Sequence, residues 1–311
     1  MSGITVKKKK RIGDYLFPLV SIASAVTIFF AAQYAAAILM FALKIDSQKY
    51  EGAFVMLYNV LAIGGLVVFS SQSRFFYSDK NSGVHYKKPE MIKVILVIMI
   101  AFGLLGLVHT YMVAATTIAD HAKGGVVEQE LEKYSEAVDR YSEVEVEEVS
   151  KADKIFYYVG VAFVVPLAEE LLFRGLILGP LLKKYHGALA VIISAVIFGV
   201  MHGISIHIGY AFMSGIIIGC VYCFTRNIAY TYIIHMIFNF FGSIIHMILE
   251  DGWFTVSENT MNAIYSYSYL FQFSMIIPCF VALFIFYARY KKQRQLEKKQ
   301  EESEEKETIE A

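Results

Sequence analysis

Long apolar runs recur along this chain, and they constrain its fold more than any other feature. A membrane-spanning helix needs about 20 consecutive, mostly apolar residues. Runs of about this length, separated by charged or short polar connections, cover residues 15–43, 53–71, 94–119, 155–182, 188–206, 208–224, 228–249 and 265–287. We therefore predict an all-α polytopic membrane protein with about eight transmembrane helices.

The composition agrees with this prediction and excludes other classes of protein. Hydrophobic residues make up 57% of the chain, charged residues 18%, and the mean hydropathy is +0.51. A soluble domain has about 45–50% apolar and about 25% charged residues. The 28 basic and 28 acidic side chains cancel, so we expect no nucleic-acid partner. Three cysteines are too few for a disulfide scaffold.

The charged segments divide the chain and predict its orientation. We expect a basic N-terminus (1–14), three helices (15–119), an acidic extramembrane loop (120–154), a core (155–249), a loop with the last helix (250–289) and a charged tail (290–311). Placing the basic segments on one side of the bilayer leaves the acidic loop on the other. The positive-inside rule then predicts a multi-pass protein of the cell membrane with both termini in the cytoplasm.

The charged tail consists of a basic part followed by an acidic part, and we interpret the two parts differently. The basic run Arg289–Lys299 is typical of a topology determinant that can touch anionic lipid. The acidic, low-complexity stretch Glu301–Glu310 is expected to be disordered.

Charged side chains stand near the centre of the fourth run. Each costs about 2.5–3.5 kcal/mol in the middle of a membrane helix unless it finds a partner, and Glu169, Glu170 and Arg174 lie together there. Glu170 and Arg174 are about 40° apart on an α-helix, so we expect a structural ion pair. Glu169 lies about 140° from Arg174. Without a partner on its own helix, it is a candidate functional carboxylate.

Polar side chains recur at one-turn spacing on two later runs. Phe198 and His202 are four residues apart on the fifth run, as are His235 and Asn239 on the seventh. Taken singly, an intramembrane histidine or asparagine is at least as often a helix–helix contact as a functional group. Together with Glu169 they supply the carboxylate, imidazole and amide groups that activate water and stabilise an oxyanion.

These residues resemble the three ordered motifs of the CAAX protease and bacteriocin-processing (Abi/Rce1-like) family, written EExxxR, FxxxH and HxxxN or HxxxB. The matching segments are Glu169-Glu170-Leu-Leu-Phe-Arg174, Phe198-Gly-Val-Met-His202 and His235-Met-Ile-Phe-Asn239. The resemblance covers roughly residues 155–249. It implies an intramembrane endopeptidase with helices 4, 5 and 7 around a central cavity, acting on membrane-embedded or lipidated peptides and proteins.

Carried over by position, the resemblance also implies residue roles. Glu169 and His202 would activate the attacking water, and His235 and Asn239 would hold the oxyanion. The residues that support the site would be Glu170, Arg174 and Phe198. Two mechanisms stay open at this point: a glutamate mechanism without a metal, which we favour, and a zinc site formed by Glu169, His202 and His235 with water as the fourth ligand.

Two other functions remain compatible with these residues. A catalytically silent membrane scaffold or immunity factor could keep the motifs for folding alone. A proton-coupled transporter could use intramembrane glutamate and histidine as a relay, although no inverted repeat of the motif segment is present in the first half. A Glu169→Ala substitution distinguishes the protease from the scaffold, because a scaffold keeps its phenotype and a protease loses it.

Two small-residue patterns predict packing. Glycines four residues apart, at 199 and 203 and again at 215 and 219, favour close helix approach. Cys220 and Cys223 form a CxxC inside an apolar run, where buried cysteine behaves as a small hydrophobic residue.

Overall fold

The computed structural model describes residues 12–77, 86–122, 125–133, 149–203 and 205–310. Within these ranges the chain is helical with short connections and contains no strand, so the predicted all-α class is confirmed. Six of the described helices are long and apolar enough to cross a membrane, as expected of a polytopic membrane protein. They cover residues 19–42, 51–72, 91–121, 206–225, 228–250 and 258–304.

Long helices form the N-terminal third of the chain. They are α1 (Ile12–Ala42), α2 (Glu51–Tyr77) and α3 (Met91–His121). A further short helix covers residues 126–133, inside the loop that we expected to be extramembrane. Most of the remainder of that loop, residues 134–148, lies outside the described residues.

The next segment is one continuous helical rod with two wider stretches. It consists of α5 (Lys151–Val159), the π-helix η1 (Gly160–Val164), α6 (Val165–Glu170), the π-helix η2 (Leu171–Leu178) and α7 (Gly179–Lys184). All eight residues of η2 are buried, so this rod passes through the core. It corresponds to the predicted fourth span.

The remaining helices follow with short connections. They are α8 (Gly187–Met201), α9 (Ser205–Thr225), α10 (Ile228–Asn239), the π-helix η3 (Phe240–Ile244), α11 (Ile245–Glu250), α12 (Glu258–Ser274) and α13 (Ile276–Glu310). The predicted fifth span is the short apolar helix α8, with 15 residues. The full set of eight crossings therefore stays a prediction.

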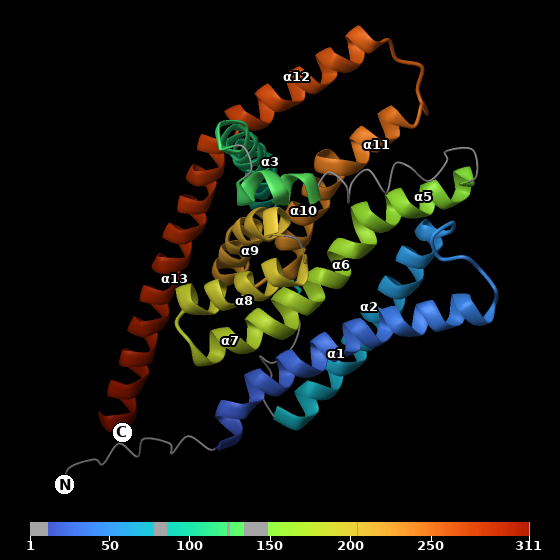
Figure 1. Cartoon of the computed structure of the whole chain (residues 1–311). Helices are drawn as coiled ribbons and strands as arrows, with labels where there is room; N and C mark the ends of the chain where they lie inside the picture. Colours follow the sequence, from blue (N-terminus) through green and yellow to red (C-terminus); the bar gives the residue numbers. More distant parts are fainter. Residues whose placement is uncertain (1–11, 78–85, 123–124, 134–148, 204, 311) are drawn as a thin grey trace.

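The helices pack in layers around the central rod. Figure 1 shows the rod from α5 to α7 between α1 and α2 on one side and α8 to α10 on the other. The elements in contact agree, because α2 packs on α5 and α6, α1 on η2, and α10 on α6. Helices α12 and α13 pack on α3, which itself contacts α10. The rod thus meets both α8 and α10, the helices that carry the other two motifs.

The end of α8 is set by one glycine. Gly203 has φ +82°, a left-handed conformation that glycine adopts without steric cost and that commonly ends helices. His202 is the last residue before it, and its backbone N–H still donates to the Gly199 carbonyl at 3.0 Å. The local sequence therefore places His202 at a helix terminus.

The predicted close approach of α8 and α9 is confirmed at three of the four glycines. A Cβ atom on Gly215 would lie 3.0 Å from the Ala195 Cα, and one on Gly199 would lie 3.2 Å from the Ile208 carbonyl oxygen. Gly219 packs against Val191 in the same way. Gly203 has open space around it and serves the turn instead.

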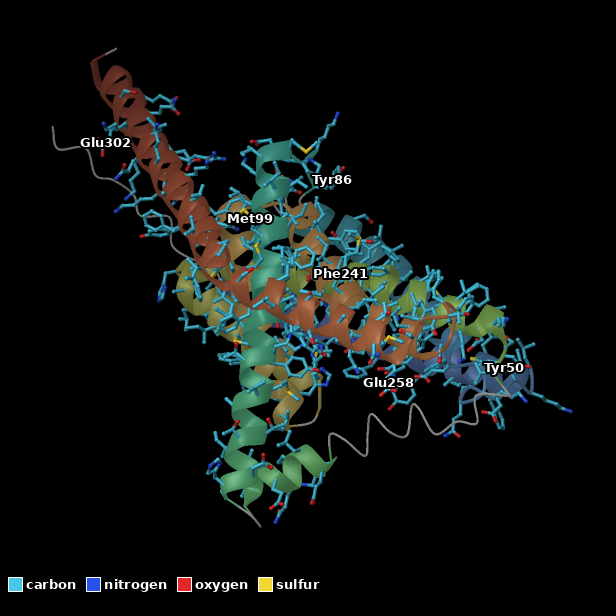
Figure 2. The ribbon with its side chains drawn as sticks, turned by 90° about the horizontal axis from the view of Figure 1, so that it is seen from above. Tyr50, Tyr86, Met99, Phe241, Glu258 and Glu302 are labelled. Carbon is cyan, nitrogen blue, oxygen red and sulfur yellow. The ribbon has the colours of Figure 1, made fainter. Side chains whose placement is uncertain are left out.

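The expectation of a disordered tail was wrong. Helix α13 continues to Glu310, and Figure 2 shows Glu302 on the part that extends away from the other helices. Glutamate and lysine have high helix propensity, and a helix already nucleated in the bundle propagates at little cost. Local pairs such as Gln293 Nε2 to Glu297 Oε1, 3.0 Å, support the exposed turns.

A buried aspartate fixes the start of α2 to the rod. Asp153 is 4% exposed, and its carboxylate accepts the Gly52 and Ala53 backbone N–H groups, both at 2.9 Å. These are N–H groups of the first turn of α2, which have no partner within the helix. The negative charge also lies at the positive end of the helix dipole.

We predict that Asp153→Ala lowers the free energy of unfolding by about 1–3 kcal/mol, because two charge-assisted hydrogen bonds are lost. Thermal unfolding of the purified protein in detergent measures the effect. The exposed residue Asp120 provides the matched control. Equal melting of Asp153→Ala and Asp120→Ala would contradict the assigned role.

Candidate active site

The predicted site residues lie on three neighbouring segments of the bundle. Glu169 and Glu170 end α6, and Arg174 follows in η2. The other two segments are α8, with Phe198 and the terminal His202, and α10, with His235 and Asn239.

π-Helical segments flank these residues. Helices η1 and η2 lie on either side of α6, and η3 begins directly after Asn239. π-Turns inside α-helices occur frequently at functional sites. Because a π-helix bonds residue i to i+5, Arg174 comes closer to alignment with Glu169 than an α-helix would allow. The ion pair of the guanidinium is nevertheless with Glu170.

Glu170 lies at the centre of a buried charge cluster. Its Oε1 atom is 3.3 Å from an Arg174 guanidinium nitrogen and accepts a hydrogen bond from His235 Nδ1 at 2.9 Å. The side chains of Glu170 and Arg174 are 0% and 1% exposed. The ion pair predicted from the four-residue spacing is therefore present, and His235 from α10 bonds to the same carboxylate oxygen.

Glu169 lies on the other side of the same imidazole. Its Oε2 atom is 3.6 Å from His235 Nε2, and its side chain is 15% exposed. His235 thus faces two consecutive carboxylates, one with each ring nitrogen. The sequence indicated that Glu169 has no partner on its own helix, and the structure supplies one from α10.

Phe198 is the packing centre of the site. Its ring lies 5.0 Å from the Arg174 guanidinium carbon, a cation–π distance. The same ring is 4.4 Å from the His202 ring and 6.1 Å from the His235 ring, measured between centroids. Phe173 packs edge-on at 4.7 Å. Phe198 therefore contacts both motif histidines and the buried arginine.

His202 has a defined ring orientation. Its Nδ1 atom lies 2.7 Å from the Phe198 carbonyl oxygen. A carbonyl oxygen only accepts, so Nδ1 carries the hydrogen and Nε2 keeps its lone pair when the ring is neutral. On its other side, the His202 ring lies 5.1 Å from the ring of His207.

Asn239 bonds to the backbone of the rod. Its Nδ2 atom donates to the Val161 carbonyl oxygen of η1 at 3.0 Å. In the described part of the chain, no hydrogen bond joins Asn239 to Glu169, His202 or His235. The amide therefore ties α10 to the rod, and its second N–H is not used in that bond.

Two residues near the site were not among the predicted catalytic ones, although the position of His207 near a predicted span end indicated a residue at the mouth of the site. Thr231 is fully buried one turn before His235, and its hydroxyl donates to the Ile228 carbonyl oxygen at 3.0 Å. Thr231 is four residues before His235, so the sequence already indicates that the two residues share one face of the helix. His207 packs between His202 and Tyr210, with its ring stacked on the tyrosine at 4.5 Å.

The three candidate zinc ligands do not form a ligand set in this arrangement. No group of three or more histidine, cysteine, aspartate or glutamate side chains with metal-binding geometry occurs in the described residues. Glu169 and His235 approach each other, whereas His202 packs on the Phe198 ring and bonds to the Phe198 carbonyl oxygen. We therefore derive no step through a metal.

The buried cluster predicts non-additive stability effects. Arg174→Met leaves Glu170 without its cation and should lower the free energy of unfolding by about 3–5 kcal/mol. The double variant Glu170→Gln/Arg174→Met removes both charges and keeps an acceptor for His235, so it should be more stable than Arg174→Met alone. Thermal unfolding in detergent compares the two.

The exposed Arg294 offers a control for the same substitution. Arg294→Met should change the free energy of unfolding by no more than about 0.5 kcal/mol, since its side chain is 60% exposed. If the double variant is less stable than Arg174→Met, the charge cluster does not act as a unit.

Comparison with known proteins bears on residues 151–241. This segment matches the family model described as type II CAAX prenyl endopeptidase Rce1-like. Comparisons with curated proteins and with solved structures give no significant match. The matched segment begins with α5, ends inside η3 and contains all of the motif residues. Residues 151–241 of this chain are thus a domain of the Rce1-like type II CAAX prenyl endopeptidase family.

Proposed function

We propose that this chain is an intramembrane endopeptidase that hydrolyses peptide bonds of membrane-embedded or lipidated peptides and proteins, with Glu169 as the general base. One observation carries the proposal: the partly exposed Glu169 carboxylate faces His235, whose other nitrogen is held by the buried Glu170. Membership of the matched domain in a protease family supports the reaction class.

Charge balance supports the proposed resting state. The four side chains Glu169, His235, Glu170 and Arg174 sum to zero when His235 is an imidazolium, and an uncompensated charge in a low-dielectric interior is costly. In this state His235 donates through Nδ1 to Glu170 and presents Nε2–H beside Glu169. The Nε2 atom lies 3.6 Å from Glu169 Oε2, within ion-pair distance.

The proposed reaction is a two-step hydrolysis. Glu169 takes a proton from water while the water oxygen bonds to the scissile carbonyl carbon. The carbonyl oxygen becomes an oxyanion, and the His235 Nε2–H donates to it. As the C–N bond breaks, Glu169 passes its proton to the leaving amine, so the carboxylate is restored.

His202 and Asn239 have supporting parts in this proposal. The unprotonated Nε2 of His202 accepts a hydrogen bond from the attacking water or relays its proton, as the tautomer set by Phe198 allows. Asn239 holds α10 against η1 through Val161, and its second N–H is available to the oxyanion. We also propose that the site opens into a central cavity between the predicted fourth, fifth and seventh spans, which are the rod, α8 and α10.

We further propose eight membrane crossings with both termini in the cytoplasm. The support comes from the basic residues at one end of the bundle. Lys87 and Lys88 precede α3, Arg226 lies in the α9–α10 connection and Arg289 lies within α13, yet all four line one pocket. Basic loops collected on one side are what the positive-inside rule requires of a cytoplasmic face.

Glu169→Gln tests the proposal, because it keeps the shape of the side chain and removes the base. We expect the cleavage rate of quenched, membrane-anchored peptides by the purified protein to fall by at least about a hundredfold. The protein should still fold, because glutamine keeps the shape of the side chain and the Glu170–Arg174 ion pair stays intact. The readout is initial cleavage rate in detergent or liposomes.

The exposed Glu258 supplies a matched control, because Glu258→Gln makes the same chemical change away from the site. Each variant is also assayed with a metal chelator. Cleavage that persists with chelator and is lost only in Glu169→Gln supports the glutamate mechanism. Loss with chelator that zinc restores would move the site to metal catalysis. Full activity of Glu169→Gln would contradict the proposal.

A further inference from the structure

A basic pocket lies at one end of the bundle, apart from the residues proposed for catalysis. Its volume is about 740 Å³, and it is enclosed by the segment before α3, the α9–α10 connection and the outer part of α13. None of the motif residues lines it. Leu182, on its wall, follows Glu169 by about three helical turns along the same rod.

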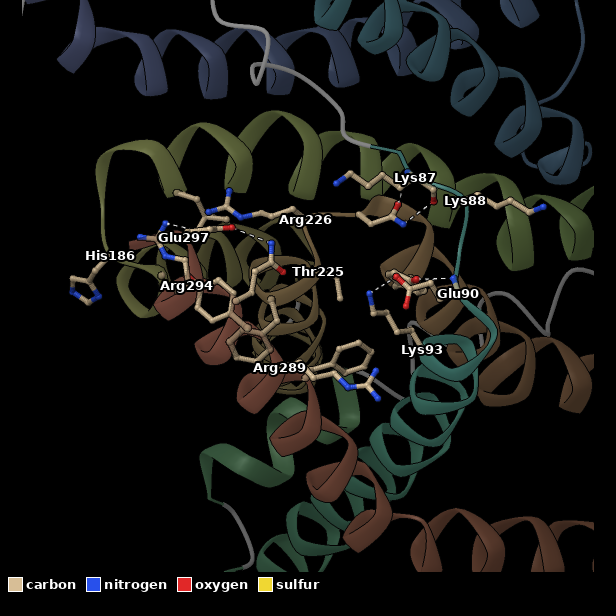
Figure 3. Close-up of a pocket in the computed structure, with 18 of the residues that line it drawn as sticks. Lys87, Lys88, Glu90, Lys93, His186, Thr225, Arg226, Arg289, Arg294 and Glu297 are labelled. Atoms are coloured by element: carbon tan, nitrogen blue, oxygen red, sulfur yellow. Dashed lines mark hydrogen bonds and ion pairs between the residues drawn. The ribbon is translucent and has the colours of Figure 1, made fainter. Parts of the chain in front are cut away.

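The lining of this pocket has a large excess of positive charge. Its basic side chains are Lys87, Lys88, Lys93, Arg226, Arg289 and Arg294, whereas its carboxylates are Glu90 and Glu297. Figure 3 shows the lysines on one side of the pocket, Arg289 and Arg294 from α13 on another, and Arg226 between them. The cations come from three separate parts of the chain and line the same pocket.

The two carboxylates neutralise only two of these cations. Glu90 pairs with Lys93 at 2.5 Å, and Glu297 lies 3.6 Å from Arg294. Within the described residues, no carboxylate forms an ion pair with the other four: Lys87, Lys88, Arg226 and Arg289. The pocket thus has uncompensated charge that an anionic ligand would balance.

Buried side chains fix the walls of the pocket. Asn227, 2% exposed, accepts the Lys87 N–H at 3.1 Å and donates to the Lys87 carbonyl oxygen at 2.7 Å. The hydroxyl of the buried Tyr230 accepts the Glu90 N–H at 2.8 Å. The segment before α3 is therefore anchored to the start of α10. The arrangement of lysines is built into the fold.

Arg226 adds an independent observation. It has φ +49°, a left-handed conformation that is uncommon for residues other than glycine. A glycine would relieve this conformation but would provide no charge. The chain keeps an arginine at the turn where its side chain lines the pocket.

The surroundings indicate an amphiphilic ligand. Aromatic side chains line the pocket below the cations, among them Phe224 and Tyr290, whose rings lie 5.6 Å apart. Beyond the pocket, the membrane-spanning part of α13 presents exposed apolar side chains, including Phe284 and Tyr287, 67% and 46% exposed. Aromatic residues with basic neighbours at the end of an apolar helix are typical of the headgroup level of a bilayer.

We propose that this pocket binds the phosphate headgroup of an anionic phospholipid, whose acyl chains lie along the exposed apolar face of α13. Arginine and lysine together recognise a phosphodiester through hydrogen bonds and charge. Basic pockets between membrane helices at the cytoplasmic level are suited to such headgroups. Because the catalytic residues take no part in it, this site is independent of the proposed protease activity.

The test measures lipid binding to the purified full chain in detergent by native mass spectrometry, with phosphatidylglycerol, phosphatidylcholine and glycerol phosphate as probes. The pocket variant is Lys88→Gln/Arg289→Gln. Its control is Lys291→Gln/Lys292→Gln, which removes the same charge from exposed positions of α13 outside the pocket lining. All four positions are exposed, so folding should be preserved.

We expect wild type and control to prefer phosphatidylglycerol over phosphatidylcholine, and the pocket variant to bind phosphatidylglycerol about tenfold or more weakly. Glycerol phosphate should not compete. Equal losses in the two variants would reduce the effect to general surface charge and overturn the proposal. So would the absence of a lipid preference, or binding of glycerol phosphate as tight as that of the lipid. Unchanged lipid binding with impaired peptide cleavage in the pocket variant would assign the pocket to the peptide substrate instead.

Discussion

A carboxylate and a guanidinium inside an apolar helix destabilise a protein unless each meets a partner, and Glu170 and Arg174 have almost no contact with solvent. Their partners decide how the neighbouring helices pack. His235 brings α10 to the rod through Nδ1, and Phe198 brings α8 through its contact with the guanidinium. Once these contacts are made, Glu169 is the charged group of the cluster with a partly exposed side chain. The proposed base is therefore positioned by the ion pair beside it.

Sequence periodicity predicted contacts within one helix better than contacts between helices. The Glu170–Arg174 pair follows from a four-residue spacing, and close packing of α8 on α9 follows from small residues. The bridge from His235 to Glu169 joins residues far apart in the chain, so no spacing could reveal it. The bond from Asn239 to Val161 is likewise a contact between helices. The π-helical stretches depend on packing that local propensity does not encode.

The family domain supplies the motif residues, and the rest of the chain encloses them. Helices α1 and α2 cover one side of the rod, and α3, α12 and α13 lie beyond α10. The basic pocket is built from both parts, since Arg226 lies inside the matched segment whereas Lys88 and Arg289 lie outside it. The proposed lipid site therefore depends on both the matched segment and the flanking helices.

The central claim is that water attacks a peptide carbonyl with Glu169 as the base. Its most direct test is mass spectrometry of the products when the purified chain, in liposomes, meets membrane-anchored peptides in water enriched in oxygen-18. The account predicts cleavage by the wild type, with one heavy oxygen incorporated into the new carboxylate in the first turnover, and no such product with Glu169→Gln. Labelled product from folded Glu169→Gln at the wild-type rate would contradict it. So would the absence of any cleavage by folded wild type across lipidated and transmembrane peptides, which would leave the domain as a membrane scaffold.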